Sequence, residues 1–128
     1  MIDISDEAFD ALITKAMDEL PQDYITGLDN VAILYADEPD EYQREISHLH
    51  EHSILLGLYE GIPLTKRGTN YTFVLPDKIT LFKLPILSVV NSEAELFEQI
   101  KRTLWHEIAH FYGLEHVHID ALERKKKK

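Results

Sequence analysis

The chain has 128 residues, of which 45% are hydrophobic, and this is enough for one domain that buries a core without help from a metal. Its formal net charge is −10, from 13 basic and 23 acidic residues, which disfavours a surface that follows nucleic-acid phosphates. The chain contains no cysteine, so disulfides and thiolate metal sites are excluded, and His, Asp and Glu remain as metal ligands.

The N-terminal segment, residues 1–7, is acidic and lacks the basic start and apolar stretch of a signal peptide. The longest apolar runs, such as Val31–Ala36, are far shorter than the ~20 residues that cross a bilayer as a helix. We therefore expect a cytoplasmic protein.

The first predicted helix follows Ser5, which can cap it. Apolar residues then recur at the i, i+3, i+4 spacing of an amphipathic helix, and Pro21 ends the pattern. This spacing predicts a helix that packs on the core through Phe9, Leu12, Ile13, Ala16, Met17 and Leu20.

Three short apolar segments are predicted to be strands. Val31–Ala36 is typical of a buried strand, and Ile54–Tyr59 of a second strand. The third segment, Ile79–Leu84, lies between Pro76 and Pro85. Proline at both ends favours an edge strand over a central one.

The acidic segment of residues 37–51 is compatible with a helix, and its secondary structure stays open. It leads into His48, His50 and His52, which would share one side of a strand; in a helix, His48 and His52 would share a face. A second metal site is one interpretation of this segment. A solvated acidic segment is the simpler interpretation, and we adopt it.

The last predicted helix begins with a capping box, in which Ser92 is the N-cap and Glu95 follows three residues later. The helical pattern continues to Tyr112, and Gly113 stands where a left-handed residue commonly ends a helix. At ~1.5 Å per residue this helix is about 30 Å long, enough to cross a small domain.

This helix carries two histidines four residues apart, His106 and His110. At about 100° per residue, they project only ~40° apart from neighbouring turns. Glu107 falls between the histidine face and the apolar face, where a carboxylate can orient and deprotonate a metal-bound water. The apolar stripe lies about 140° around the helix, so the histidines are predicted to face a cleft or solvent; it consists of Phe97, Ile100, Leu104, Ile108 and Phe111.

A third ligand is available just after the helix. Gly113 permits a sharp turn, which would bring His116 back to His106 and His110. Three protein ligands with one open position is the arrangement of a catalytic zinc site rather than a structural one. Alternative third ligands lie close by in the sequence: Glu115, His118 and Asp120.

Residues 106–116 resemble the metzincin signature, with His106, His110 and His116 at the ligand positions and Glu107 at the general-base position. From about Asp29 onward, the chain is similar to a short bacterial family of zinc metallopeptidases with a minimal zincin-like fold. The segments that carry this similarity are Gly57–Leu64, Leu75–Phe82 and His106–His110.

The resemblance implies an α+β fold in one domain, residues 1–124, with a small twisted mixed sheet, an N-terminal backing helix and a C-terminal active-site helix. Residues 125–128 are predicted to be a disordered basic tail. The resemblance also implies Zn2+ as cofactor and hydrolysis of peptide bonds. We expect a peptide or protein substrate to add to the predicted edge strand at Ile79–Leu84, with no nucleic-acid or membrane partner; the oligomeric state stays open.

Two departures from the metzincin pattern keep alternatives open. The methionines of this chain are Met1 and Met17, so no methionine turn follows His116, and only twelve residues come after it. We therefore expect the usual C-terminal wall of the specificity pocket to be absent, and a non-catalytic binding or regulatory protein is the main alternative.

A metal-dependent ribonuclease is less favoured, because similar ribosomal-RNA maturation enzymes carry glycine at the position of Glu107 and need a basic surface. Candidates for stabilising an oxyanion are Tyr59, Tyr71 and Arg67.

Overall fold

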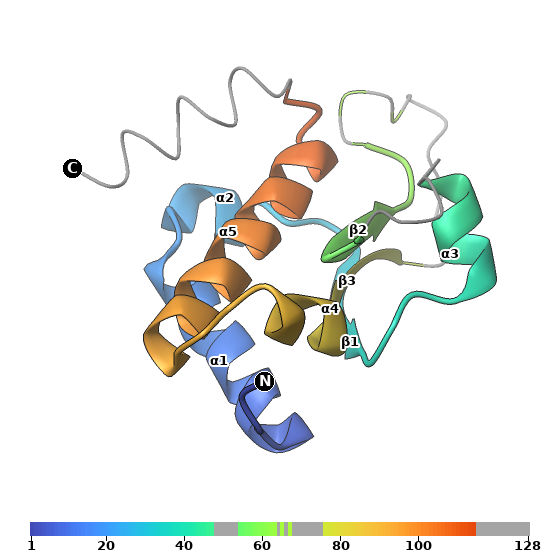
Figure 1. The fold of residues 1–128 in the computed structure, drawn as a ribbon. Helices are drawn as coiled ribbons and strands as arrows, with labels where there is room; N and C mark the ends of the chain where they lie inside the picture. Colours follow the sequence, from blue (N-terminus) through green and yellow to red (C-terminus); the bar gives the residue numbers. More distant parts are fainter. Residues whose placement is uncertain (48–53, 64, 66, 68–75, 115–128) are drawn as a thin grey trace.

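The computed structural model describes residues 1–47, 54–63, 65, 67 and 76–114. Helices α1, α2, α3, α4 and α5 and strands β1, β2 and β3 form a single α+β domain (Figure 1). In chain order the elements are α1 Asp6–Glu19, α2 Gln22–Thr26, β1 Val31–Ala36, α3 Glu41–Ile46, β2 Gly57–Glu60, β3 Asp77–Phe82, α4 Lys83–Ser88 and α5 Glu93–Phe111. No helix among these residues is both long and apolar enough to traverse a membrane.

The sheet has the order β1-β3-β2, with β1 parallel and β2 antiparallel to β3. The predicted small mixed sheet is thus confirmed, but the prediction of an edge strand at Ile79–Leu84 is wrong. β3 is the central strand, and the segment's last residues, Lys83 and Leu84, already belong to α4. The prolines do not interrupt the ladder, because Pro76 precedes the strand and Pro85 lies in the first turn of α4, where its missing N–H is not needed.

The two edge strands are β1 and β2. Strand β1 has the predicted bounds, but it is not buried: Leu34 is 43% and Tyr35 is 37% exposed. The second strand is shorter than predicted and begins at Gly57 rather than at Ile54. The segment left open by the sequence contains α3, which begins with a capping box between Asp40 and Gln43.

Helix α1 follows the prediction closely. The Ser5 side chain accepts a hydrogen bond from the Ala8 amide at 3.1 Å. Four residues of the predicted stripe are buried in the core, and Leu12 and Met17 are partly buried against it; the buried four are Phe9, Ile13, Ala16 and Leu20.

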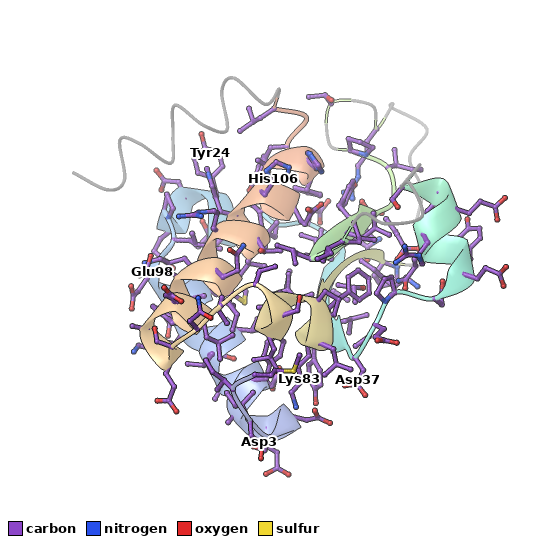
Figure 2. All side chains as sticks on the ribbon, viewed as in Figure 1. Asp3, Tyr24, Asp37, Lys83, Glu98 and His106 are labelled. Atoms are coloured by element: carbon purple, nitrogen blue, oxygen red, sulfur yellow. The ribbon has the colours of Figure 1, made fainter. Side chains whose placement is uncertain are left out.

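Helix α5 packs against α1 on one side and against β2 and β3 on another. Figure 2 shows the side chains that fill these contacts. Ser92 caps the helix by accepting from the Glu95 amide at 3.1 Å. The reciprocal bond of the predicted capping box is shifted by one residue, since the Glu95 carboxylate accepts from the Asn91 amide at 2.6 Å.

The C-terminal end of α5 is a Schellman motif. Gly113 has φ +75°; its amide donates to the His110 carbonyl at 2.9 Å, and the Leu114 amide donates to the Ala109 carbonyl at 3.0 Å. The predicted left-handed turn at Gly113 is therefore confirmed. The predicted third metal ligand, His116, follows this turn and lies outside the described residues.

Candidate metal centre

Two imidazole rings on successive turns of α5 form the centre of the candidate site. The rings of His106 and His110 have centroids 4.7 Å apart with an interplanar angle of 69°, and both side chains are partly exposed. The i, i+4 spacing produces this pairing directly. As predicted, the two histidines do not belong to the core, although Ile108 and Ala109 between them do.

Glu107 completes a group of three potential ligands. One ring nitrogen from each histidine and one carboxylate oxygen of Glu107 all lie within 4.8 Å of one another. Ligands that share a zinc ion at about 2.0–2.2 Å are at most ~4.4 Å apart, so small side-chain rotations bring these atoms into range. The two imidazoles are nitrogen donors of the kind that zinc accepts, and a carboxylate beside them can take a proton from a metal-bound water. The residues present therefore fit the metal that the motif implies.

A hydrogen bond links Glu107 to His110. The Nδ1 atom of His110 lies 3.1 Å from Oε1 of Glu107, and this bond raises the pKa of His110 above its usual value, against a smaller opposing effect of burial. With the proton on Nδ1 as the donor, the neutral ring carries its lone pair on Nε2, which is the nitrogen that would then bind a metal ion.

The Glu107 side chain is only 8% exposed. It is therefore more deeply buried than we expected from its position between the histidine face and the apolar face of the helix. It shares a helix stripe with Thr103 and Phe111, four residues before and after it, and strand β2 lies over both of these. A Cβ atom on Gly57 would come within 2.7 Å of the Thr103 methyl group, and the rings of Tyr59 and Phe111 meet edge to face at 6.2 Å. The close approach of β2 to α5 thus encloses Glu107.

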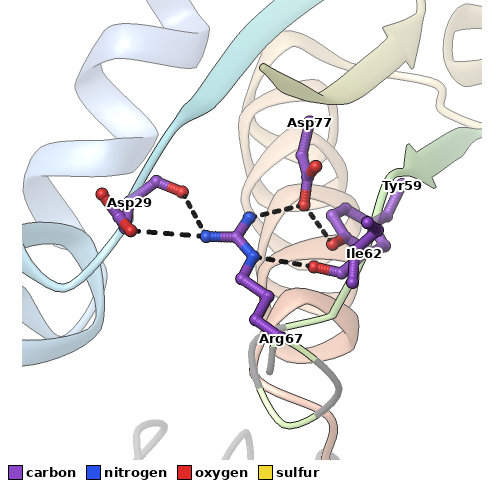
Figure 3. Close-up of polar contacts among 5 residues, drawn as sticks. All are labelled: Asp29, Tyr59, Ile62, Arg67 and Asp77. Atoms are coloured by element: carbon purple, nitrogen blue, oxygen red, sulfur yellow. Dashed lines mark hydrogen bonds and ion pairs between the residues drawn. The ribbon is translucent and has the colours of Figure 1, made fainter. Parts of the chain in front are cut away.

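Asp77, at the start of β3, is a buried carboxylate that the sequence did not single out. Tyr59 Oη and Arg67 Nη2 both donate to its Oδ2 atom, at 2.5 and 2.8 Å (Figure 3). Tyr59 and Arg67 had been candidates for stabilising an oxyanion, and both instead direct these donors at Asp77. Nothing in the local sequence signals this cluster, because its members come from segments that only the fold brings together.

His116 and its alternatives as third ligand, together with the basic tail at 125–128, lie outside the described residues. The same holds for Tyr71 and for the second histidine group at 48–52. The ligand set of His106, His110 and His116 therefore remains a prediction, of which the structure places two members, His106 and His110, next to each other.

Two comparisons with known proteins found a match to this chain, one to a family model and one to a solved structure. A family model described as zincin-like metallopeptidase matches residues 28–126. A solved structure of a conserved hypothetical protein from T. thermophilus has the same fold, with a TM-score of 0.54 and 22% sequence identity over 94% of this chain and 99% of that one. No curated protein matches the chain.

Proposed function

The chain belongs to the zincin-like metallopeptidase family, and from this premise we propose that it is a zinc-dependent peptidase. In this proposal His106, His110 and His116 hold the ion, and Glu107 is the general base. The observation that carries the proposal is that one ring nitrogen from each histidine and one oxygen of the buried Glu107 carboxylate lie within 4.8 Å of one another.

In this proposal, the three site residues that the structure describes, His106, Glu107 and His110, each have a defined chemical role. The two histidines present neutral nitrogen donors from adjacent turns, and the bond to Glu107 orients the ring of His110. The Glu107 carboxylate accepts the proton of the attacking water, and its burial keeps it in one orientation next to the ligands. A bound zinc ion would polarise the scissile carbonyl group and acidify the water.

The substrate is a peptide or protein that binds in extended form. Within the described residues, β2 pairs with β3 alone, so its other edge can accept an added strand. β2 also lies over α5 at Thr103 and Phe111. The segment that the sequence led us to expect as the substrate-binding edge, Ile79–Leu84, lies instead largely in the central strand β3. We therefore assign peptide binding to β2.

The test is Glu107→Gln, which keeps the shape of the side chain and removes its basicity. We expect the variant to bind zinc within a few-fold of the parent affinity, while turnover of a quenched fluorescent peptide library falls by about 100- to 10,000-fold. Glu98→Gln is the matched control, because Glu98 is an exposed residue of the same helix whose carboxylate contacts Lys101. Equal turnover in Glu107→Gln and the parent would reject the proposal.

A further inference from the structure

The Arg67–Asp77 ion pair is unusually well shielded from solvent. The two atoms Arg67 Nη2 and Asp77 Oδ2 lie 2.8 Å apart, and the side chains are 5% and 4% exposed. Charges removed from water lose hydration that their mutual attraction only partly returns, so such a pair adds little net stability compared with apolar residues of similar size. A pair of this kind is better explained by the geometry that it enforces.

Arg67 connects four separate parts of the fold, and Figure 3 shows three of these contacts, with Asp77, Ile62 and Asp29. Besides Asp77 at the start of β3, its guanidinium donates to the Ile62 carbonyl after β2 and to the Asp29 carbonyl before β1, each at 3.0 Å. Its guanidinium carbon also lies 5.0 Å from the centre of the Phe111 ring on α5, a separation typical of a cation–π contact. Phe111 is the residue directly after the proposed ligand His110.

The end of strand β2 is fixed between Asp77 and Phe111. The Tyr59 hydroxyl donates to Asp77, and the Tyr59 ring meets the Phe111 ring edge to face. Two residues later, Gly61 has φ +153°, and a Cβ atom there would clash with the Asp77 carboxyl group. Burial, and secondarily the bond to Asp77, raises the pKa of Tyr59, so its hydroxyl remains a donor throughout the neutral range.

We propose that Tyr59, Asp77 and Arg67 form a positioning unit that fixes edge strand β2 against the histidine-bearing turn of α5 and thereby aligns a β2-bound peptide with the metal site. This proposal rests on the proposed function. The three residues are positioning residues: they hold the strand that binds substrate.

Misalignment has a distinct kinetic signature. A peptide on a displaced β2 still forms its backbone hydrogen bonds, so KM changes little, but its scissile bond is no longer in place. A displacement of about 1 Å can lower turnover by up to ~100-fold. The effect therefore appears in kcat, and a role in global stability alone would leave kcat per folded molecule unchanged.

The first experiment compares Tyr59→Phe with Tyr35→Phe in the zinc-loaded full-length protein. Tyr35→Phe makes the same chemical change on the opposite edge strand, β1. For Tyr59→Phe we expect amide hydrogen exchange at residues 57–60 to accelerate about tenfold, while exchange at residues 100–111 and zinc affinity stay within about twofold of the parent. On the peptide library, kcat should fall about tenfold with KM within about threefold.

The second experiment compares Arg67→Lys with Arg102→Lys. Lysine keeps the charge of Arg67 but cannot reach Asp77, Asp29 and Ile62 together or stack flat on Phe111, so we expect the same selective loosening of β2. Arg102 is an exposed residue of α5, and its lysine variant should behave as the parent does.

Three results would overturn the positioning role: unchanged exchange at 57–60, equal acceleration at 57–60 and 100–111, or selective loosening with unchanged kcat. Failure of the proposed function looks different, because the zinc-loaded parent itself would then turn over no peptide. In that case the proposed alignment of a substrate is rejected together with the proposed function. The hydrogen-exchange data still decide whether the positioning unit holds β2 in place.

Discussion

His110 Nδ1 lies 3.1 Å from Oε1 of Glu107, three residues earlier on α5. The residues that we propose for metal binding and for proton transfer are thus in direct contact with each other. The contact ties the orientation of the ligand to the position of the base.

The ligand assignment predicts the zinc affinities of single variants. His106→Ala and His110→Ala should each lower zinc affinity by about 100-fold or more, since even the loss of an indirect partner of a zinc ligand costs about 10- to 100-fold. His116→Ala should have a comparable effect, and His118→Ala is its control. The measurement is competition with a chelator of known affinity. Parent-like affinity in His116→Ala together with loss in His118→Ala would reassign the third ligand.

The Glu107–His110 bond predicts a pH dependence of the metal-free protein. Because the pKa of His110 is raised in the fold, its stabilising contribution is complete below the unfolded value of about 6.5 and is lost as pH rises through the folded value. The side chain is 36% exposed, so solvent screening keeps this contribution below about 1 kcal/mol. In urea unfolding, the free energy of unfolding at pH 5.5 relative to that at pH 8.5 should increase less in Glu107→Gln than in the parent. An identical increase in both proteins would contradict the assignment of this effect to the Glu107–His110 bond.

Gly113→Ala is predicted to destabilise the protein by about 1–3 kcal/mol. Part of the cost is the left-handed backbone at φ +75°, and part is contact, because a Cβ atom would lie 2.5 Å from Thr65 Oγ1. Thr65→Ala should restore the second part only, which chemical denaturation of the double variant can show. If His116 is the third ligand, zinc affinity should fall as well, and unchanged affinity would place that ligand elsewhere.

The approach of β2 to α5 predicts a coupled pair. Gly57→Ala should cost about 1–3 kcal/mol of unfolding free energy, because its methyl group would meet the Thr103 methyl group at 2.7 Å. Thr103→Ser removes that methyl and keeps the hydroxyl that accepts from Gln99. The double variant should recover about 1 kcal/mol relative to the sum of the single effects. Strict additivity would mean that Leu81 and the Thr80 carbonyl, which also lie near Gly57, set the cost.

Much of the two long helices could be predicted from the sequence, since their signals are local. Ser5 and Ser92 cap the helices where expected, and the apolar stripe of α1 is the buried one. Gly113 adopts the left-handed conformation that a glycine at a helix end favours. The same locality fixes the pairing of His106 with His110, because one helical turn separates them whatever the rest of the fold does.

The arrangement of the sheet and the environment of the site were decided by tertiary structure. The prolines beside β3 favoured an edge position, but strand order depends on which distant segments pair, and both β1 and β2 pair with β3. Glu107 is buried one helical turn from Thr103, where Gly57 lets β2 approach α5 closely. Arg67 has the composition of an exposed loop around it, yet it reaches Asp29, 38 residues away, and Asp77, 10 residues away. Helix periodicity and capping depend on residues a few positions apart, whereas strand order and buried polar contacts depend on pairings between distant segments, which no local pattern encodes.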